Sequence, residues 1–102
     1  MGRAVRTPLA RDDLKEIGRY IARKSQNRDV AARFLDTVER RLKLLATQPE
    51  MGELRPDLGQ GIRCFSIDDY AVFYRQVAAD IEILRVLHGS RDVPSAWRSA
   101  RS

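Results

Sequence analysis

The sequence predicts an α+β fold in which a two-helix hairpin packs on one face of a twisted antiparallel sheet. Apolar residues recur at helical spacing up to about residue 46, and three short apolar runs separated by tight turns follow after residue 61. A chain of 102 residues with 43% hydrophobic residues has the size of one small domain, residues 1–102. The expected order of elements is β-α-α-β-β-β.

Residues 3–6 are expected to form the first strand, because a helix start follows directly. Thr7 can cap a helix with its hydroxyl, and Pro8 suits the first helical position, where the N–H that it lacks would have no partner. Apolar residues at positions 10, 14, 17 and 21 then share one helical face. The polar run 25–27 ends this helix near residue 25.

A second helix is expected to begin at residues 27–29, where Asn27 or Asp29 can cap it. It ends before Pro49, which cannot continue a helix. The link between the helices is short, so they should form an antiparallel hairpin. Residues 49–61 contain two prolines and three glycines and are expected to form an irregular loop.

Three strands are expected at residues 62–67, 70–77 and 81–88, joined by tight turns into an antiparallel meander. Strict alternation gives the last strand two faces, one with Leu84, Val86 and His88, the other with Ile81, Ile83, Arg85 and Leu87. Because both faces are apolar, this strand should be central and covered on both sides. One cover is the helical hairpin. The other is the C-terminal tail, residues 93–102, anchored as a short helix by Trp97, or else a partner chain.

Composition excludes several classes of protein. Cys64 is the single cysteine and His88 the single histidine, so neither an internal disulfide nor a Cys/His zinc site is possible. No apolar run reaches the roughly 18 residues of a membrane span, and the N-terminus lacks an apolar signal segment. We therefore expect a cytoplasmic protein with no metal, no cofactor and no membrane partner.

The net charge of +5 is concentrated in the helical half of the chain. Residues 1–48 hold 12 cations and 6 anions, whereas residues 49–102 hold 7 and 8. A basic half indicates a nucleic acid, an acidic protein partner or a solvated surface, and charge alone leaves these three open.

Five segments carry a family signature: Asp13-Leu14-Lys15-Glu16-Ile17 with Tyr20-Ile21; Leu44-Leu45-Ala46 with Pro49 and Met51-Gly52; Gly61-Ile62-Arg63; Tyr70 with Val72-Phe73-Tyr74-Arg75; and residues 83–88 with Gly89, Arg91 and Asp92. In this order and spacing they resemble the ParE branch of the ParE/RelE superfamily of bacterial toxins. The resemblance covers residues 3–93, nearly the whole chain.

The resemblance implies the β-α-α-β-β-β fold and the role of toxin in a type II toxin–antitoxin module. ParE-like toxins inhibit DNA gyrase and are blocked by a ParD-like antitoxin, whose C-terminal segment wraps around the toxin. The implied protein is a binding poison rather than an enzyme, and it meets nucleic acid only through the antitoxin complex. RelE-like toxins of the same fold instead cut mRNA on the ribosome.

The alternative, ribosome-dependent mRNA cleavage, needs a general base, a general acid and cations for the phosphate. The chain has no lysine after Lys43 and no tyrosine after Tyr74. The candidates left are Arg63 and Arg85 for the phosphate and His88 as the acid, with Glu50 or Glu53 as the base.

For the binding poison, we expect contacts with gyrase through Trp97 and Arg98 of the C-terminal tail and through Arg91 just before it, because tryptophan and arginine dominate binding hot spots. The antitoxin is expected on the helices, at an apolar and a cationic set of residues: Leu14, Ile17, Tyr20, Arg33, Arg40 and Arg41. A solvated face is the alternative for the cationic set.

Two charged residues of the last strand also have structural interpretations. Arg85 lies among apolar neighbours, so it is either an anion site or one half of an internal ion pair, with Asp68 or Asp92 as partner. His88 is either a general acid or target contact, or a strand-end residue that bonds locally to residues 89–91.

Overall fold

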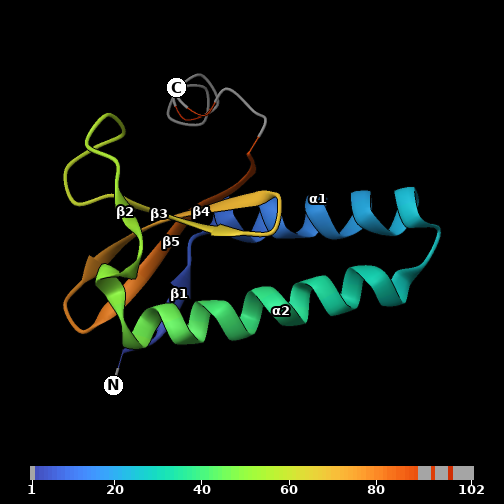
Figure 1. Ribbon diagram of the computed structural model, residues 1–102, viewed down its shortest axis with the longest axis horizontal. Helices are drawn as coiled ribbons and strands as arrows, with labels where there is room; N and C mark the ends of the chain where they lie inside the picture. The colour runs from blue at the N-terminus through green and yellow to red at the C-terminus, as the bar shows by residue number, and fades with distance from the viewer. Residues whose placement is uncertain (1, 90–92, 94–96, 98–102) are drawn as a thin grey trace.

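The structure, a computed structural model, describes residues 2–89, Val93 and Trp97. Two helices and a five-stranded sheet confirm the α+β fold (Figure 1). The elements are β1 (Ala4–Arg6), α1 (Pro8–Ser25), α2 (Arg28–Thr47), the 3-10 turn η1 (Pro49–Met51), β2 (Glu53–Leu54), β3 (Arg63–Ile67), β4 (Tyr70–Val77) and β5 (Asp80–His88). Within the described part of the chain, neither helix is long and apolar enough to cross a membrane.

The helix boundaries follow the predicted capping signals. The Thr7 hydroxyl accepts a hydrogen bond from the Ala10 N–H at 3.2 Å and begins α1. Gln26, with a left-handed φ of 56°, ends it, and the Asn27 side chain then accepts from the Asp29 N–H at 2.8 Å. The two helices run antiparallel, as predicted, and their connected ends reach beyond the sheet (Figure 1).

The sheet has the order β1-β5-β4-β3-β2, with β5 near its centre. β3, β4 and β5 form the predicted antiparallel meander, but β1 pairs parallel to β5, so the sheet is mixed. The chain passes from β1 through the helical hairpin, β3 and β4 before it reaches β5, a long crossover that permits parallel pairing. The predicted irregular loop contains two short elements that sequence patterns did not predict, η1 and the edge strand β2.

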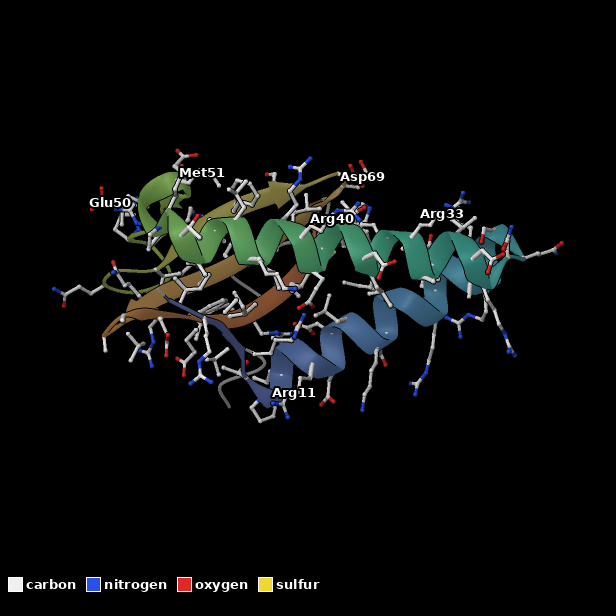
Figure 2. All side chains as sticks on the ribbon, turned by 90° about the horizontal axis from the view of Figure 1, so that it is seen from below. Arg11, Arg33, Arg40, Glu50, Met51 and Asp69 are labelled. Carbon is white, nitrogen blue, oxygen red and sulfur yellow. The ribbon has the colours of Figure 1, made fainter. Side chains whose placement is uncertain are left out.

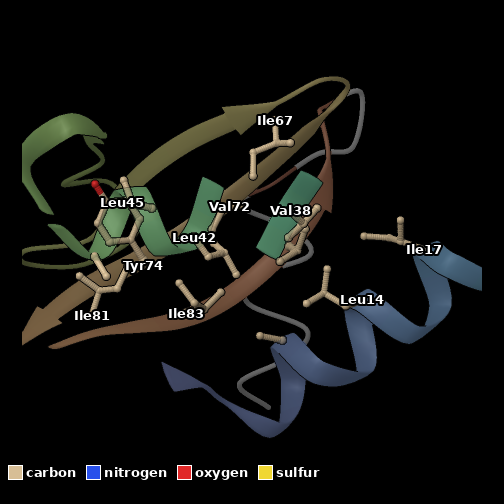
Figure 3. Close-up of a cluster of buried hydrophobic side chains, with 13 residues drawn as sticks. Leu14, Ile17, Val38, Leu42, Leu45, Ile67, Val72, Tyr74, Ile81 and Ile83 are labelled. Atoms are coloured by element: carbon tan, nitrogen blue, oxygen red, sulfur yellow. The ribbon is translucent and has the colours of Figure 1, made fainter. Parts of the chain in front are cut away.

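The main core lies between the sheet and the helical hairpin (Figure 3). Leu14 and Ile17 of α1 and Leu42 of α2 pack here against strand residues such as Ile83. Tyr74 of β4 is fully buried in this core with its ring beside Leu45 (Figure 3). The apolar helix faces therefore lie where their spacing predicted.

Because β5 contains a β-bulge, the residues that share each of its faces differ from the prediction. The register shifts between Phe73 and Tyr74, which leaves Leu84 without a partner on β4. An extra residue interrupts the alternation of side chains. Val86 therefore packs in the helix-side core, whereas Leu84 packs with Leu87 on the opposite face. The predicted face that joined Leu84 to Val86 is wrong.

A second, smaller core covers the other face of the sheet. Phe73 and Leu87 pack there against Leu58 and Ile62 of the loop and against Trp97. The prediction of a central strand covered on both sides is confirmed, and the loop supplies part of the cover alongside Trp97.

Candidate binding site

A groove between α1 and the ends of β4 and β5, here called the aromatic groove, has a volume of about 430 Å³. It brings together residues predicted for different roles, Ile17 and Tyr20 as antitoxin contacts and His88 as a candidate acid. Three elements line it: Asp13, Glu16, Ile17, Tyr20 and Arg23 from α1, Tyr70 from β4, and Val86, Leu87 and His88 from β5.

A row of rings forms one wall of the aromatic groove. The Tyr70 ring stands between Phe34 of α2 and His88, with both centroid distances at 5.2 Å, and it meets His88 edge-on at 81°. Tyr20 is 46% exposed, and Lys24 lies 5.6 Å from its ring centroid. Partial burial raises the pKa of Tyr70, and the nearby Tyr20 adds to this effect. The groove therefore offers exposed aromatic surface.

Asp13 closes the aromatic groove at the edge of β5. Its carboxylate accepts hydrogen bonds from the Arg85 guanidinium at 2.8 and 2.9 Å and from the Val86 N–H at 2.9 Å. β1 ends opposite Ile83, so this carboxylate satisfies a strand edge that β1 no longer covers. The hydrogen bonds to Asp13 raise the pKa of Arg85. Asp13 is thus a structural clamp between α1 and β5.

A second groove, here called the hairpin groove, lies between α1 and α2 and has a volume of about 380 Å³. Apolar side chains and charged groups both line it: Arg6, Arg11, Leu14, Lys15, Leu35, Val38 and Glu39. Arg6 forms an ion pair with Glu39, whereas Arg11 and Lys15 form no ion pair within the described residues. The groove is apolar with a net positive rim, a surface suited to an acidic amphipathic segment.

The cationic set predicted for the antitoxin lies along α2. Arg33, Arg40 and Arg41 are all exposed. Arg33 and Arg40 lie two helical turns apart, about 10 Å, and Figure 2 shows both on α2, with Arg11 near the start of α1. Arg33, Arg40 and Arg41 line neither groove, so the predicted set divides into groove residues on α1 and surface cations on α2.

Of the three candidate cleavage residues, Arg63 and His88 are well separated along the sheet. Arg63 pairs with Tyr74 and His88 with Tyr70, which separates them by four residues of β4, about 13 Å. The Arg63 guanidinium donates to the main-chain carbonyls of Glu50 and Gly52, at 3.2 and 2.7 Å.

Arg85 is held by Asp13 on the α1 side, so the predicted internal ion pair is confirmed with a partner that was not predicted. Asp68 is not the partner, and Asp92 lies outside the described residues. Sequence spacing could not find this pair, because the two residues are 72 positions apart and meet only through the fold.

The tail predicted to contact the target is described only at Val93 and Trp97, while Arg91 and Arg98 lie outside the described residues. Trp97 is 9% exposed and meets the Phe73 ring edge-on at a centroid distance of 5.7 Å. Trp97 is therefore an anchor in the second core. Among residues 2–89, 93 and 97, no three histidine, cysteine or acidic side chains cluster as a metal site would require.

Comparisons with known proteins agree with the fold and the motif order. The family model described as "ParE toxin of type II toxin-antitoxin system, parDE" matches residues 5–93. The chain belongs to this ParE toxin family. A curated ParE relative, "Toxin ParE3" of Caulobacter vibrioides, is 35% identical over 89 residues, which are 87% of this chain and 88% of the relative.

A solved structure of a toxin–antitoxin assembly has the same fold. A chain of the "Chromosomal ParDE TA system from P. aeruginosa" superposes with a TM-score of 0.71 at 21% identity, covering 86% of this chain and 95% of that chain. The ParE signature can now be placed on the structure. Asp13, Arg63 and Tyr74 all belong to its segments, and each bonds to the backbone of another element. Arg85 and Gly52, also in the signature, are the partners of Asp13 and Tyr74.

Proposed function

We propose that this ParE-family toxin arrests growth by binding DNA gyrase, and that a ParD-like antitoxin blocks it by covering the grooves beside α1. The choice of a binding poison rests on what the two candidate phosphate ligands contact. Arg63 is bonded to main-chain carbonyls and Arg85 to a carboxylate, and neither lines a groove with His88.

RNA cleavage demands that the phosphate ligands and the acid converge on one scissile bond, within hydrogen-bonding reach of it. Both candidate phosphate ligands are instead engaged within the fold, Arg63 by main-chain carbonyls and Arg85 by Asp13, and the backbones of Arg63 and His88 lie about 13 Å apart along β4. Protein binding has no such requirement, because hot-spot residues can be spread over a surface of several hundred Å². The arrangement favours binding over cleavage.

The two grooves give the antitoxin complementary chemistry. The hairpin groove, with Leu14 below and Arg11 and Lys15 at its rim, suits an acidic amphipathic segment. The aromatic groove, with Ile17 and Tyr20, suits an apolar or aromatic anchor. A segment that wraps around α1 would fill both grooves, with the surface arginines of α2 steering it electrostatically.

Arg91 and Arg98 stay in the proposal as target contacts beside Trp97. Burial of Trp97 against Phe73 supports a role in which the indole holds the tail in place while arginines make the contact. Deletion of residues 95–102 would remove the anchor, Trp97, together with the proposed target contact Arg98.

The deciding experiment compares two activities of the full-length toxin. Purified toxin added to gyrase and DNA should trap cleaved DNA, and toxin added to translating ribosomes should leave mRNA intact. The variant His88→Ala should keep the gyrase activity, because catalysis by an acid is not involved. Cleaved mRNA that disappears with His88→Ala would instead establish the nuclease and refute the proposal.

A further inference from the structure

The segment that follows α2, here called the 49–54 turn, places several side chains in solvent at one end of the molecule. Figure 2 shows Glu50 and Met51 projecting there beyond the last turn of α2. Met51 is 39% exposed and Leu54 53% exposed, and Glu50 and Glu53 are exposed as well. Two apolar and two acidic side chains thus share one short turn.

Side chains of the sheet hold this turn in place through a network of hydrogen bonds. The hydroxyl of Tyr74, a fully buried side chain, donates to the Pro49 carbonyl at 2.7 Å and accepts from the Gly52 N–H at 2.8 Å. Arg63 donates to the carbonyls of Glu50 and Gly52. Four hydrogen bonds from the sheet therefore fix the backbone on both sides of Met51, at Pro49, Glu50 and Gly52.

Gly52 permits this arrangement by close approach rather than by an unusual dihedral angle. Its φ is −77°, but a Cβ added there would lie 2.4 Å from the Tyr74 hydroxyl oxygen. A loop that only joined α2 to β3 would need neither these hydrogen bonds nor this close approach. A turn held so firmly presents Met51 with little conformational entropy left to lose on binding, which is how recognition surfaces gain affinity.

Charge separates the 49–54 turn from the hairpin groove. Glu50 and Glu53 form no ion pair within the described residues, whereas the hairpin groove has a net positive rim. An acidic segment attracted to the hairpin groove would be repelled here. The turn also lies at the other end of the sheet, as Tyr74 and Ile17 mark in Figure 3.

We infer that the 49–54 turn is a contact with the target protein, in which Met51 enters an apolar socket and Glu50 and Glu53 face basic side chains at the rim. The inference rests on the proposed function only in that the toxin acts by binding a target protein. It adds a contact surface separate from the C-terminal tail.

The test uses full-length toxin with Met51→Ala, with Val5→Ala as the matched control. Val5 is 44% exposed but lies on β1, at the opposite edge of the sheet. Met51→Ala should weaken binding to purified gyrase at least ten-fold and reduce growth arrest, with antitoxin affinity unchanged. Val5→Ala should change neither. Full arrest by Met51→Ala, or a loss of antitoxin affinity in its place, would overturn the inference.

The charge part is tested with Glu50→Gln and Glu53→Gln, which keep the shape of each side chain. The double variant should bind gyrase several-fold more weakly at low salt and lose most of the salt dependence of the association rate. An unchanged salt dependence would refute the basic rim.

Failure of the proposed function can be told apart from failure of this inference. If wild-type toxin does not trap gyrase, the proposed target is wrong, and growth arrest then decides: loss of arrest in Met51→Ala still supports a target contact at the turn. A photo-crosslinker at position 51 gives the partner directly. Capture of purified gyrase supports the inference, whereas capture of antitoxin or of a second toxin copy overturns it.

Discussion

The two ends of the sheet use polar and aromatic side chains in opposite ways. Where α2 ends, Tyr74 and Arg63 direct four hydrogen bonds at the backbone of the 49–54 turn. At the other end, Tyr70 and His88 meet ring against ring and line a groove beside the exposed Tyr20. A side chain that bonds to backbone fixes the shape of a surface. Rings that meet edge-on leave part of their surface to a ligand.

Breaking the Asp13 clamp should have the largest effect on the groove end. Asp13→Ala leaves the Arg85 charge and the Val86 N–H without partners, in a site where both side chains of the ion pair are only 12–13% exposed. The free energy of unfolding should fall by about 3 kcal/mol, measured by urea denaturation. The exposed neighbour variant Asp12→Ala should cost no more than about 1 kcal/mol. Similar losses in both variants would contradict the clamp.

Overpacking the other end should have the next largest effect. Gly52→Ala places a methyl group against the Tyr74 ring and should lower the free energy of unfolding by about 1–3 kcal/mol. Tyr74→Phe removes the nearest atom and two hydrogen bonds, so the double variant should be less destabilised than the sum of the single variants.

A matched control exists in α1. Gly18→Ala meets only the flexible end of Leu35, at 3.3 Å, and gains helix propensity, so it should be neutral or slightly stabilising. Additive effects of Gly52→Ala and Tyr74→Phe would show that the two residues are not coupled.

These couplings mark the limit of what the sequence predicts. Helix caps at Thr7 and Asn27 and the three meander strands could be predicted, because each depends on neighbouring residues. The β-bulge at Leu84 could not, since it depends on how β5 is paired and packed. Nor could the meeting of Tyr74 with Gly52, which join elements 22 positions apart.

The residues of the candidate site also divide into those that the local sequence predicts and those that depend on contacts between distant elements. Ile17 and Tyr20 were predicted as binding residues from their positions in α1, and they line a groove. Tyr70 was not singled out, because nothing in its own strand shows that it lies between Phe34 and His88. A tyrosine at the start of a strand beside a tight turn is the signal that could have found it.

Truncating Tyr20 should change binding far more than stability. Its side chain is 46% exposed, so Tyr20→Ala should alter the free energy of unfolding by about 0.5 kcal/mol or less. Antitoxin affinity, measured by titration calorimetry, should fall about ten-fold or more, with growth arrest retained. Tyr20→Phe should keep most of the affinity, because the ring face makes the contact. Unaltered affinity in Tyr20→Ala would remove the aromatic groove from the antitoxin site.

The smallest effect is expected in the alkaline titration of the tyrosines. Burial raises the pKa of both Tyr70 and Tyr74 above the ordinary value near 10. The folded state then holds protons that the unfolded state has released, so this stabilisation is complete below about pH 10 and is lost as the pH rises through the folded pKa. Tyr70→Phe and Tyr74→Phe should each reduce the slope of unfolding free energy against pH above 10. Identical slopes would contradict the raised pKa values.

Amide hydrogen exchange of the toxin with and without its antitoxin tests most directly whether the two ends serve different partners. On antitoxin binding, α1 and the end of β5 around His88 should become protected, because the segment covers both grooves. The 49–54 turn should exchange at the same rate in free and bound toxin, since it is kept for the target. Strong new protection at residues 49–54, with α1 unchanged, would contradict the account.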